Sequence, residues 1–515
     1  MNKNHNSILM IFMCAALSFL IIQYDIKLVT GVIIILTSLS VMFVFPELGT
    51  WAVFFAIYAN LPVIAVRYHN VPHLVAMAIP LLLGIPLASY IIVRHEKLII
   101  DNVFLLMLAF LVVIISSSLF AKDMKIAAQW IITLVLEGLA LYLLIINVVR
   151  NLATLRRVIW VLLLTGSLLG ALSLYQELTH SYMNHFGGLA LRGGDDETEM
   201  AKAGNQGNTS LPAQNDKCVC GTERAAGPLD GPNRYAQMML VILPFGLFFF
   251  WGERSWVRRL SAAAAAILIL SGVLLSYSRG ACVTLGLMLL FLTYMRYIRP
   301  YQILLSAFAI LLLIAVAAPR YLLRAESIGG AESLVSNNAA AQADAPIRGR
   351  ITEMLAALHV FLDYPILGVG PGQYSPFYSI DYQLDPNIAF RFLPRTRRAH
   401  SLYFEMAAET GFIGLGIFLS MPLLVLYGLW QERRRWAHCR PDLANMAMAF
   451  VLCIVAYFGT ALFLHFSYQR YYWLLLALAG ATLQICRSAT PPRVEPPADP
   501  MPSPPALLQV AMRSL

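Results

Sequence analysis

YAQMMLVILPFGLFFFWGERSWVRRLSAAAAAILILSGVLLSYS, residues 235–278, contains two apolar runs that are joined by a short charged turn. Each run is long enough to cross the ~30 Å hydrocarbon core of a bilayer as an α-helix. The whole chain of 515 residues has the same character, with 59% hydrophobic and 13% charged residues and a mean hydropathy of +0.68. Soluble domains average about 45–50% apolar and 25% charged residues. The composition therefore excludes a soluble enzyme and a fibrous or disordered protein, and it predicts an all-α, polytopic membrane helical bundle.

Apolar runs of roughly 16–25 residues recur along the chain, and each of them is a candidate transmembrane helix. We predict about 14 such spans, near residues 8–22, 28–45, 49–66, 73–93, 103–120, 127–147, 158–178, 235–251, 261–278, 281–295, 301–318, 401–429, 445–464 and 470–486.

The short loops between these runs predict the orientation of the protein. Alternate loops are rich in arginine, as at residues 254–259 and 433–440, whereas the loops between them carry few basic residues. Because Lys and Arg are enriched in cytoplasmic loops, we expect both termini in the cytoplasm of a bacterial inner membrane. This topology also accounts for the net charge of +9, so we expect no nucleic-acid partner.

Two long polar segments interrupt the spans, and both fall on the outer, periplasmic side. The first is rich in Gly, Asn, Asp and Glu and is typical of a flexible insert. The chain thus divides into N-terminal spans (1–178), a periplasmic insert loop (179–234), further spans (235–318), a large periplasmic loop (319–400), C-terminal spans (401–486) and a cytoplasmic Pro-rich tail (487–515).

The large periplasmic loop contains an amphipathic helix. Its apolar positions share one arc: Ile351, Met354, Leu355, Leu358, Phe361 and Leu362. Thr352, His359 and Asp363 lie on the opposite face, so the helix is expected to lie on the outer membrane face or to cap the bundle. Arg350 stands at the start of this helix, where free N–H groups and the helix dipole favour anions. The alternative, an ordinary surface arginine at a loop–helix junction, remains open.

A basic cluster follows in the same loop, at Arg391, Arg395, Arg397 and Arg398. Since the planar guanidinium group suits a diphosphate, the cluster is a candidate phosphate-binding patch at the membrane surface. The alternative is a solvated basic patch, because long loops are translocated whatever their charge.

His400 stands between this patch and the next span. The neighbouring positive charge favours the neutral imidazole, which can accept a proton; a capping or interfacial histidine is the alternative. Glu409 follows about two and a half turns into the span, where a carboxylate is either functional or a structural hydrogen-bond partner.

Two further arginines lie at the outer ends of spans. Arg279, in SYSRGA, is a candidate site residue or an arginine that extends to the interface. Arg234 precedes the eighth predicted span. No group of residues has convincing metal-ligand spacing, so we assign no metal.

Three motifs together resemble a known family. They are SYSRGA (276–281), the stretch from Arg350 to DYPILGVGPGQY (363–374), and RTRRAHSLYFEMAAETGFIGLG (395–416). Their order and spacing resemble those of the bacterial O-antigen ligase and O-antigen polymerase superfamily of multispan inner-membrane glycosyltransferases. The resemblance covers about residues 225–430.

This resemblance implies transfer of a glycan from an undecaprenyl-diphosphate carrier to an acceptor hydroxyl at the periplasmic face. The family's essential arginines and histidine correspond to Arg279, Arg350 and His400, which work without a metal, a cofactor or a nucleotide sugar. The arginines would stabilise the departing diphosphate and His400 would act as general base, with inversion at the anomeric carbon. The expected substrate-binding residues are Arg234, Arg395, Arg397, Arg398 and Glu409. We also expect a lipid-open groove for the carrier tail beneath the outer loop.

Three functions compete. A ligase would join the carrier-linked polysaccharide to lipid A-core or a similar acceptor, and a polymerase would use another carrier-linked repeat unit as acceptor. A transporter or flippase should show paired halves with ionisable groups at the midplane. The candidate residues gather at the outer surface in one half of the chain, which favours an enzyme, and the close spacing of the Arg/Arg/His set slightly favours the ligase.

Overall fold

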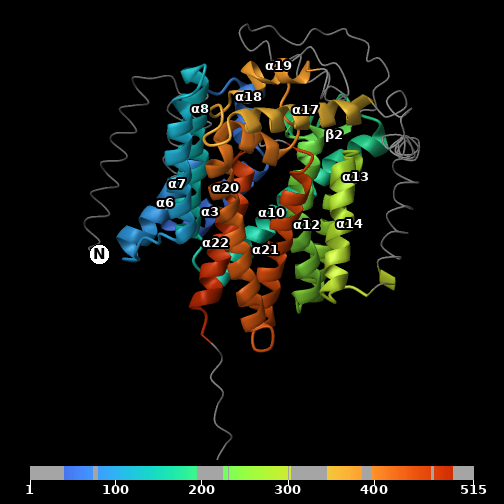
Figure 1. Cartoon of the computed structure of the whole chain (residues 1–515). Coiled ribbons are helices and arrows are strands. Elements are labelled where there is room, and N and C mark those ends of the chain that lie inside the picture. The colour runs from blue at the N-terminus through green and yellow to red at the C-terminus, as the bar shows by residue number, and fades with distance from the viewer. Residues whose placement is uncertain are drawn as a thin grey trace, which may run out of the picture.

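The computed structural model describes residues 40–72, 79–193, 224–229, 231–299, 301–302, 345–385, 396–464 and 469–490. These parts of the chain are almost entirely helical (Figure 1). Within them, the strands β1 (Leu191–Gly193) and β2 (Arg224–Gly227) form a single antiparallel pair. The prediction of a helical membrane protein therefore agrees with the structure.

The first half of the described chain contains α3 (Pro46–Tyr58), α4 (Leu61–His69), η1 (Pro80–Leu83), α6 (Gly84–Ala88), η2 (Ser89–Val93), α7 (Asn102–Ser118), α8 (Met124–Thr133), η3 (Leu134–Ala140), α9 (Leu141–Val148), α10 (Leu152–Thr179) and η4 (Phe186–Gly188). Polar caps fix several of these helix starts. Asp101, Asp123 and Asn151 each accept a hydrogen bond from a backbone amide in the first turn of the following helix. The elements α8, η3 and α9 run on as one apolar rod of 25 residues.

The second half contains β1 (Leu191–Gly193), β2 (Arg224–Gly227), α12 (Pro232–Gly252), α13 (Trp256–Leu275), α14 (Arg279–Tyr294), α17 (Ala345–Asp363), α18 (Tyr374–Phe377), α19 (Ser379–Gln383), α20 (Leu402–Trp436), α21 (Pro441–Thr460) and α22 (Gln469–Ser488). Proline stands at the first turn of both α12 and α21, where its missing N–H costs nothing. These two helices are buried along most of their length and form the centre of the bundle.

Six helices in the described chain are long and apolar enough to cross a membrane: Met124–Val148, α10, α12, α13, α20 and α21. The pair α3 and α4, bent by 61°, would make a seventh span, and α7 and α14 are apolar but shorter. All of these lie over predicted spans. The predicted spans near 8–22, 28–45 and 301–318 lie wholly or mostly outside the described residues, so the total of about 14 stays a prediction.

The helices α17, α18 and α19 lie at one end of the bundle, and the connection between α20 and α21 lies at the opposite end (Figure 1). The helix α12 runs from its start beside β2 to the turn at 253–255, and α13 returns. At the first end, Arg224 of β2 donates a hydrogen bond to the carbonyl oxygen of Ser276 at 2.8 Å. The helix α20 also begins at this end, and its last turns carry the arginines at 433–435. Which of these two ends faces the cytoplasm stays a prediction from the loop charges.

The insert between α10 and α12 is more ordered at its base than its composition indicates. Strand β1 pairs with β2, with Leu191 opposite Gly227 and Gly193 opposite Arg224. Arg192 of β1 forms an ion pair with Glu177 at 3.0 Å, and both side chains are largely buried. The two strands are far apart in the sequence, and their pairing leaves no hydrophobic periodicity in a polar segment. The sequence therefore predicts a flexible insert throughout and does not reveal these strands.

Candidate functional site

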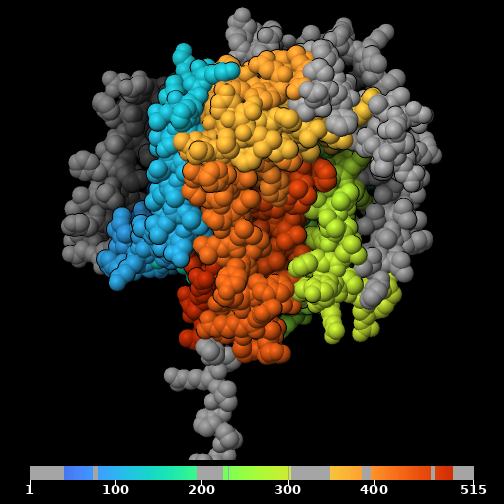
Figure 2. Space-filling model, viewed as in Figure 1, coloured from blue at the N-terminus to red at the C-terminus, as the bar shows by residue number. Residues whose placement is uncertain are grey.

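A helical cap covers one end of the bundle. It consists of α17, α18, α19 and the segment 396–400, and it lies over the start of α20 (Figure 2). The cap has its own small hydrophobic core, in which Ala357 and Val360 of α17 contact Val369, Tyr374 and Ala408. The prediction that the amphipathic helix caps the bundle therefore agrees with the packing.

The face of α17 that packs against the protein differs from its predicted apolar arc. The buried positions are Thr352, Glu353, Ala356, Ala357 and Val360. Residues of the predicted arc are half-buried, and Leu362 is 60% exposed. Small side chains allow the close helix contact here, so the large apolar side chains face away from the cap core.

Beneath the cap, α20 is broken near its start. Gly411 has φ 65° and ψ −170°, a conformation that is essentially restricted to glycine. The following amide, of Phe412, donates a hydrogen bond to the carbonyl oxygen of Pro365 at 2.8 Å. A Cβ atom on Gly411 would lie 2.1 Å from the carbonyl oxygen of Ile366. Both the backbone conformation and the close approach of the loop therefore require glycine.

The glycine-rich stretch after α17 pairs with the α20 backbone just before this break. The amides of Val369 and Gly370 donate to the carbonyl oxygens of Ala408 and Glu409, each at 3.0 Å. The hydroxyl of Ser117, from α7, donates to the same Glu409 oxygen at 2.9 Å. Carbonyl groups that the break removes from helical pairing are thus satisfied by the loop and by α7.

A buried carboxylate joins the segment before α20 to α17. Glu353 is fully buried; its Oε1 lies 3.2 Å from Nη1 of Arg397 and its Oε2 lies 3.5 Å from Nε2 of His400. His400 is itself 6% exposed and has φ 46°, in the left-handed region. A carboxylate so deeply buried is stable only when it is paired. Arg397 supplies the opposite charge, and His400 lies beside the second oxygen of the same carboxylate.

Arg398 has a different partner. Its Nε donates to Oε1 of Glu405 at 2.8 Å, and its guanidinium carbon lies 5.7 Å from the ring centroid of Trp130. Glu405 is 2% exposed. Two adjacent arginines thus hold two separate buried carboxylates, one on α17 and one on α20.

The hydroxyl of Tyr374 supports the start of this arrangement from below α17. It donates to the backbone carbonyl oxygen of Glu353 at 3.1 Å. Burial, together with the nearby charges of Glu353 and Glu405, holds the pKa of Tyr374 well above its usual value. The phenol therefore stays protonated at neutral pH and remains a hydrogen-bond donor.

The end of α21 anchors the segment that carries His400. The amide of Leu402, at the start of α20, donates a hydrogen bond to the carbonyl oxygen of Ala461 at 3.0 Å. His400 lies two residues earlier and is consequently held beside the turn at 461–464.

Arg279 comes to the same turn from α14. It is the first residue of that helix and is half-buried. A Cβ atom on its neighbour Gly280 would lie 3.0 Å from the ring of Phe463, so the start of α14 packs directly on the turn at 461–464. Arg279 and His400, which are far apart in the sequence, therefore flank one short turn.

Arg350 lies one helical turn before Glu353 on α17 and is half-buried. At about 100° per residue, the two side chains point in directions about 60° apart. Arg348 falls on the opposite flank of the buried stripe. The geometry of α17 thus places Arg350, and not Arg348, on the side of the helix that carries Glu353.

Arg234 lies at the same end of the bundle, in the first turn of α12. One turn below it, Nε2 of Gln237 donates to the carbonyl oxygen of Tyr457 at 3.2 Å. This bond ties the start of α12 to the last turn of α21, so Arg234 is part of the same surroundings.

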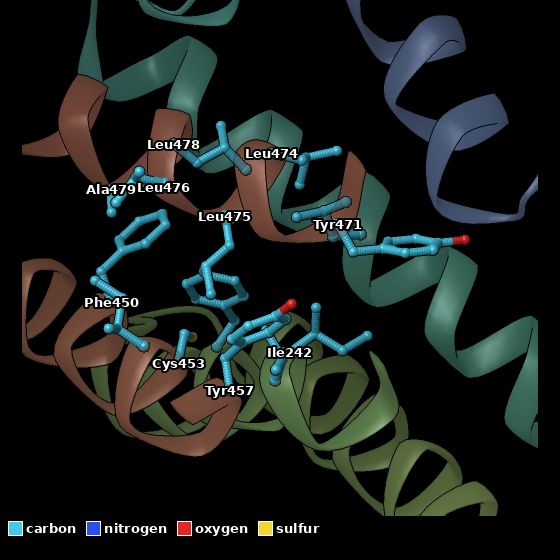
Figure 3. Close-up of a cluster of buried hydrophobic side chains, with 14 of the residues drawn as sticks. Ile242, Phe450, Cys453, Tyr457, Tyr471, Leu474, Leu475, Leu476, Leu478 and Ala479 are labelled. Atoms are coloured by element: carbon cyan, nitrogen blue, oxygen red, sulfur yellow. The ribbon is translucent and has the colours of Figure 1, made fainter. Parts of the chain in front are cut away.

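A largely apolar pocket with a cavity volume of about 30 Å³ begins at Arg234. Its lining follows α12 over residues 234–245, roughly 16 Å along the helix axis. Figure 3 shows how Ile242 of α12, Tyr457 of α21 and Leu475 of α22 project toward one another in this part of the core. The guanidinium group of Arg234 supplies a polar end to this apolar lining.

The remaining predicted residues are placed less centrally. Glu409 is 3% exposed and accepts hydrogen bonds from the backbone amides of Gly372 and Tyr374. Arg391 and Arg395 lie outside the described residues. Over the described ranges, no three His, Cys, Asp or Glu side chains are grouped as metal ligands.

Residues 264–419 match the O-antigen ligase family model. The match confirms the resemblance found in the three motifs and supports the O-antigen ligase/polymerase superfamily, whose members act on lipid-linked glycans in a membrane. The O-antigen ligase segment contains Arg279, Arg350 and His400, whereas Arg234 lies before it. A comparison with curated proteins gave no match.

Glu353 is the residue of this site that sequence reasoning missed. It shares one helix face with Ala356, Ala357 and Val360, at the spacing i, i+3, i+4, i+7. The sequence signal for Glu353 is an acidic residue that begins a stripe of small residues. Small residues indicate a helix face that packs closely against another element. A carboxylate on such a face is buried and therefore needs a partner of opposite charge. The large apolar side chains on another face of the same helix gave the stronger amphipathic pattern, so the face that contains Glu353 was not identified.

Proposed function

We propose that the protein is an O-antigen ligase-like glycosyltransferase of the bacterial inner membrane. It moves a glycan from undecaprenyl diphosphate to a hydroxyl group of lipid A-core or a similar acceptor at the periplasmic face. The single observation that supports the proposal is that the elements carrying Arg279, Arg350 and His400 lie at the same end of the bundle. Each of the three comes from a different element, and all three lie within the O-antigen ligase segment.

In the proposed step, the acceptor oxygen attacks the anomeric carbon of the carrier-linked sugar. The bond from that carbon to the diphosphate oxygen breaks, and its electron pair leaves with the diphosphate. Arg279 and Arg350 stabilise the developing charge with charge-assisted hydrogen bonds, while His400 takes the hydroxyl proton. A single displacement inverts the anomeric centre, and it requires neither a divalent metal nor a nucleotide sugar.

The other site residues bind substrate in this proposal. Arg234 meets the diphosphate end of the carrier, and the apolar pocket below it holds the adjoining part of the polyprenyl tail. Arg397 and Arg398, fixed by their carboxylate partners, and Arg395 and Glu409 contribute to binding of the glycan.

The proposed reaction requires the capped end of the bundle to face the periplasm. We therefore propose that loops 179–234 and 319–400 are periplasmic and that both termini and the tail from 487 are cytoplasmic. The last turns of α20, which carry the arginines at 433–435, lie at the end of the bundle opposite α17, α18 and α19, and this supports the orientation (Figure 1).

Cell-surface glycans of a deletion strain distinguish the ligase from the polymerase. A ligase joins finished polymer, so its loss should remove all attached polymer from the acceptor while carrier-linked polymer accumulates. Loss of a polymerase should leave single repeat units on the acceptor, and gel profiling would show them as one short band. A flippase, the third alternative, would leave carrier-linked units inside the cell.

The role of His400 is tested with the purified protein. His400→Ala should leave donor binding nearly intact and lower turnover by ~10²-fold or more. The wild-type rate should fall on the acid side as the imidazole becomes protonated. Near-normal turnover of the variant, or loss of donor binding instead of turnover, would leave His400 only a binding or capping role. The base would then be sought at Glu409 or at Asp381, an exposed residue of α19.

A further inference from the structure

Glu353 is a fully buried carboxylate to which the proposed reaction assigns no task. Its two oxygens are divided between two partners, since Arg397 contacts Oε1 at 3.2 Å and His400 contacts Oε2 at 3.5 Å. Glu405, a buried acid in the first turn of α20, contacts Arg398. Contact with both an arginine and the candidate base therefore distinguishes Glu353 from Glu405.

We infer that Glu353 is a positioning residue for His400: it accepts the Nε2 proton of the imidazole and leaves Nδ1 as the nitrogen that receives the acceptor proton. The inference rests on the proposed function, in which His400 is the general base. The two ring nitrogens of a histidine are chemically distinct, and the partner of one nitrogen selects the tautomer and fixes the ring orientation.

The geometry gives the carboxylate a fixed direction. Arg397 holds one oxygen, and the hydroxyl of Tyr374 holds the backbone of the same residue at 3.1 Å. Ala356 and Ala357, in the next turn of α17, are fully buried and keep the helix close to the cap core. These contacts hold Oε2 beside the imidazole, 3.5 Å from Nε2, where a small rotation of the ring would form the proposed hydrogen bond.

Burial strengthens the effect of this carboxylate. With Glu353 fully buried and His400 6% exposed, the pair interacts in a medium of low dielectric constant, where charge–charge and hydrogen-bond energies are larger than in water. As a proton arrives at Nδ1, the ring becomes positively charged, and the adjacent carboxylate stabilises that charge. The neighbouring charged groups are Arg350 on α17, Arg397 and Arg398 before the histidine, and Glu405 on α20.

The alternative is that the Glu353 carboxylate only forms structural ion pairs, which hold α17 against the segment 396–400 and have no effect on catalysis. Glu353→Gln separates the two roles, because the amide keeps the shape and a hydrogen-bond acceptor but loses the charge. The matched control is Glu432→Gln. Glu432 is also buried, at 8% exposure, and it contacts Arg435 and Trp436 at the opposite end of α20.

The measurement is turnover of an undecaprenyl-diphosphate-linked glycan by the full chain in lipid nanodiscs, followed against pH. Glu353→Gln should lower kcat by about 10- to 100-fold and change KM for the donor by less than about threefold. The low-pH side of the pH–rate profile (the acid limb) of this variant should move to lower pH by about one unit, because the protonated imidazole loses its negatively charged neighbour. In a His400→Ala background the same change should cause no further loss. Glu432→Gln should match the wild type.

The inference is overturned if Glu353→Gln has wild-type kcat and an unshifted acid limb, or if it lowers the residual rate equally without His400. If Glu353→Gln does not fold, Glu353→Asp is tested in its place. The shorter carboxylate keeps the charge but lies farther from the imidazole, so kcat should fall while the acid limb of the pH–rate profile stays unshifted. A wild-type kcat of Glu353→Asp would overturn the inference. Failure of the proposed function has a different signature, namely full turnover by His400→Ala itself.

Discussion

The backbone amide of Leu402 donates a 3.0 Å hydrogen bond to the carbonyl oxygen of Ala461, so the start of α20 is fastened to the end of α21. This contact involves no side chain. Substitutions at His400, two residues away, should therefore leave the segment in place. Activity measurements on such variants then report on the imidazole and not on the backbone that carries it.

Arg350→Ala should lower turnover by about 10²–10³-fold, the cost of removing one donor that is aimed at developing negative charge. Lysine should restore activity only in part, because a point charge lacks the bidentate fork of arginine. Arg348→Ala is the matched control, since Arg348 lies on the other flank of the same helix. Equal activity of the two alanine variants in a purified assay would remove Arg350 from the reaction, as would EDTA inhibition that a divalent metal reverses.

Filling the pocket below Arg234 should weaken binding of long carriers selectively. Ile242 is 1% exposed and lines the pocket, so Ile242→Phe should raise KM for an undecaprenyl donor by about tenfold and leave kcat nearly unchanged. A donor with a short prenyl chain should be affected much less. Ile267→Phe, at a side chain that is 60% exposed on α13, serves as the control. The same loss with both chain lengths would place the tail elsewhere.

Two glycines of α20 should respond to alanine in opposite directions. Gly411→Ala should destabilise the protein by about 1–3 kcal/mol or more, because it forces a side chain into a glycine-only conformation against the Ile366 carbonyl. At Gly416, a Cβ atom would meet nothing within 4 Å, and alanine there should stabilise the helix by up to about 1 kcal/mol. Thermal unfolding of both variants in the same detergent tests these predictions. A Tm of Gly411→Ala equal to that of the wild type would show that the helix is not broken at Gly411.

The two ends of the bundle should label from opposite sides of the membrane. Met183 is 87% exposed at the capped end, and the native Cys439 is exposed in the α20–α21 connection. In a background that lacks the other cysteines, Met183→Cys should react with a membrane-impermeant thiol reagent added to intact spheroplasts. Cys439 should react only after the membrane is permeabilised. Labelling of Cys439 from outside would invert the topology and exclude a periplasmic reaction.

Long apolar runs made the bundle predictable, because length and hydropathy alone identify a helix that crosses a bilayer. The start of α20 was also foreseeable, since Ser401 follows a basic segment and precedes a continuous apolar run. Motif order predicts Arg279, Arg350 and His400 as site residues; their elements lie at one end of the bundle, and their roles stay a proposal.

The contacts that bind these residues together were not predictable from the sequence. Glu353 meets His400 only because α17 folds back over α20, and that docking depends on Ala356 and Ala357 instead of on the large apolar arc. Likewise, Gly411 lies in the middle of an apolar run, where nothing local indicates a break. Pairing of the loop at 365–370 with this backbone is nonlocal, and nonlocal hydrogen bonds leave no periodicity.

The cap core formed by residues such as Val360, Val369, Tyr374 and Ala408 is separate from the large core of the bundle. A separate core forms its own cooperative unit, which opens with its own free energy. Mild heating or denaturant should thus open the cap while the membrane helices stay intact. Retained helix content is therefore no sign of a competent protein, and hydrogen exchange at the amides of Val369 and Gly370 should follow inactivation more closely than circular dichroism does.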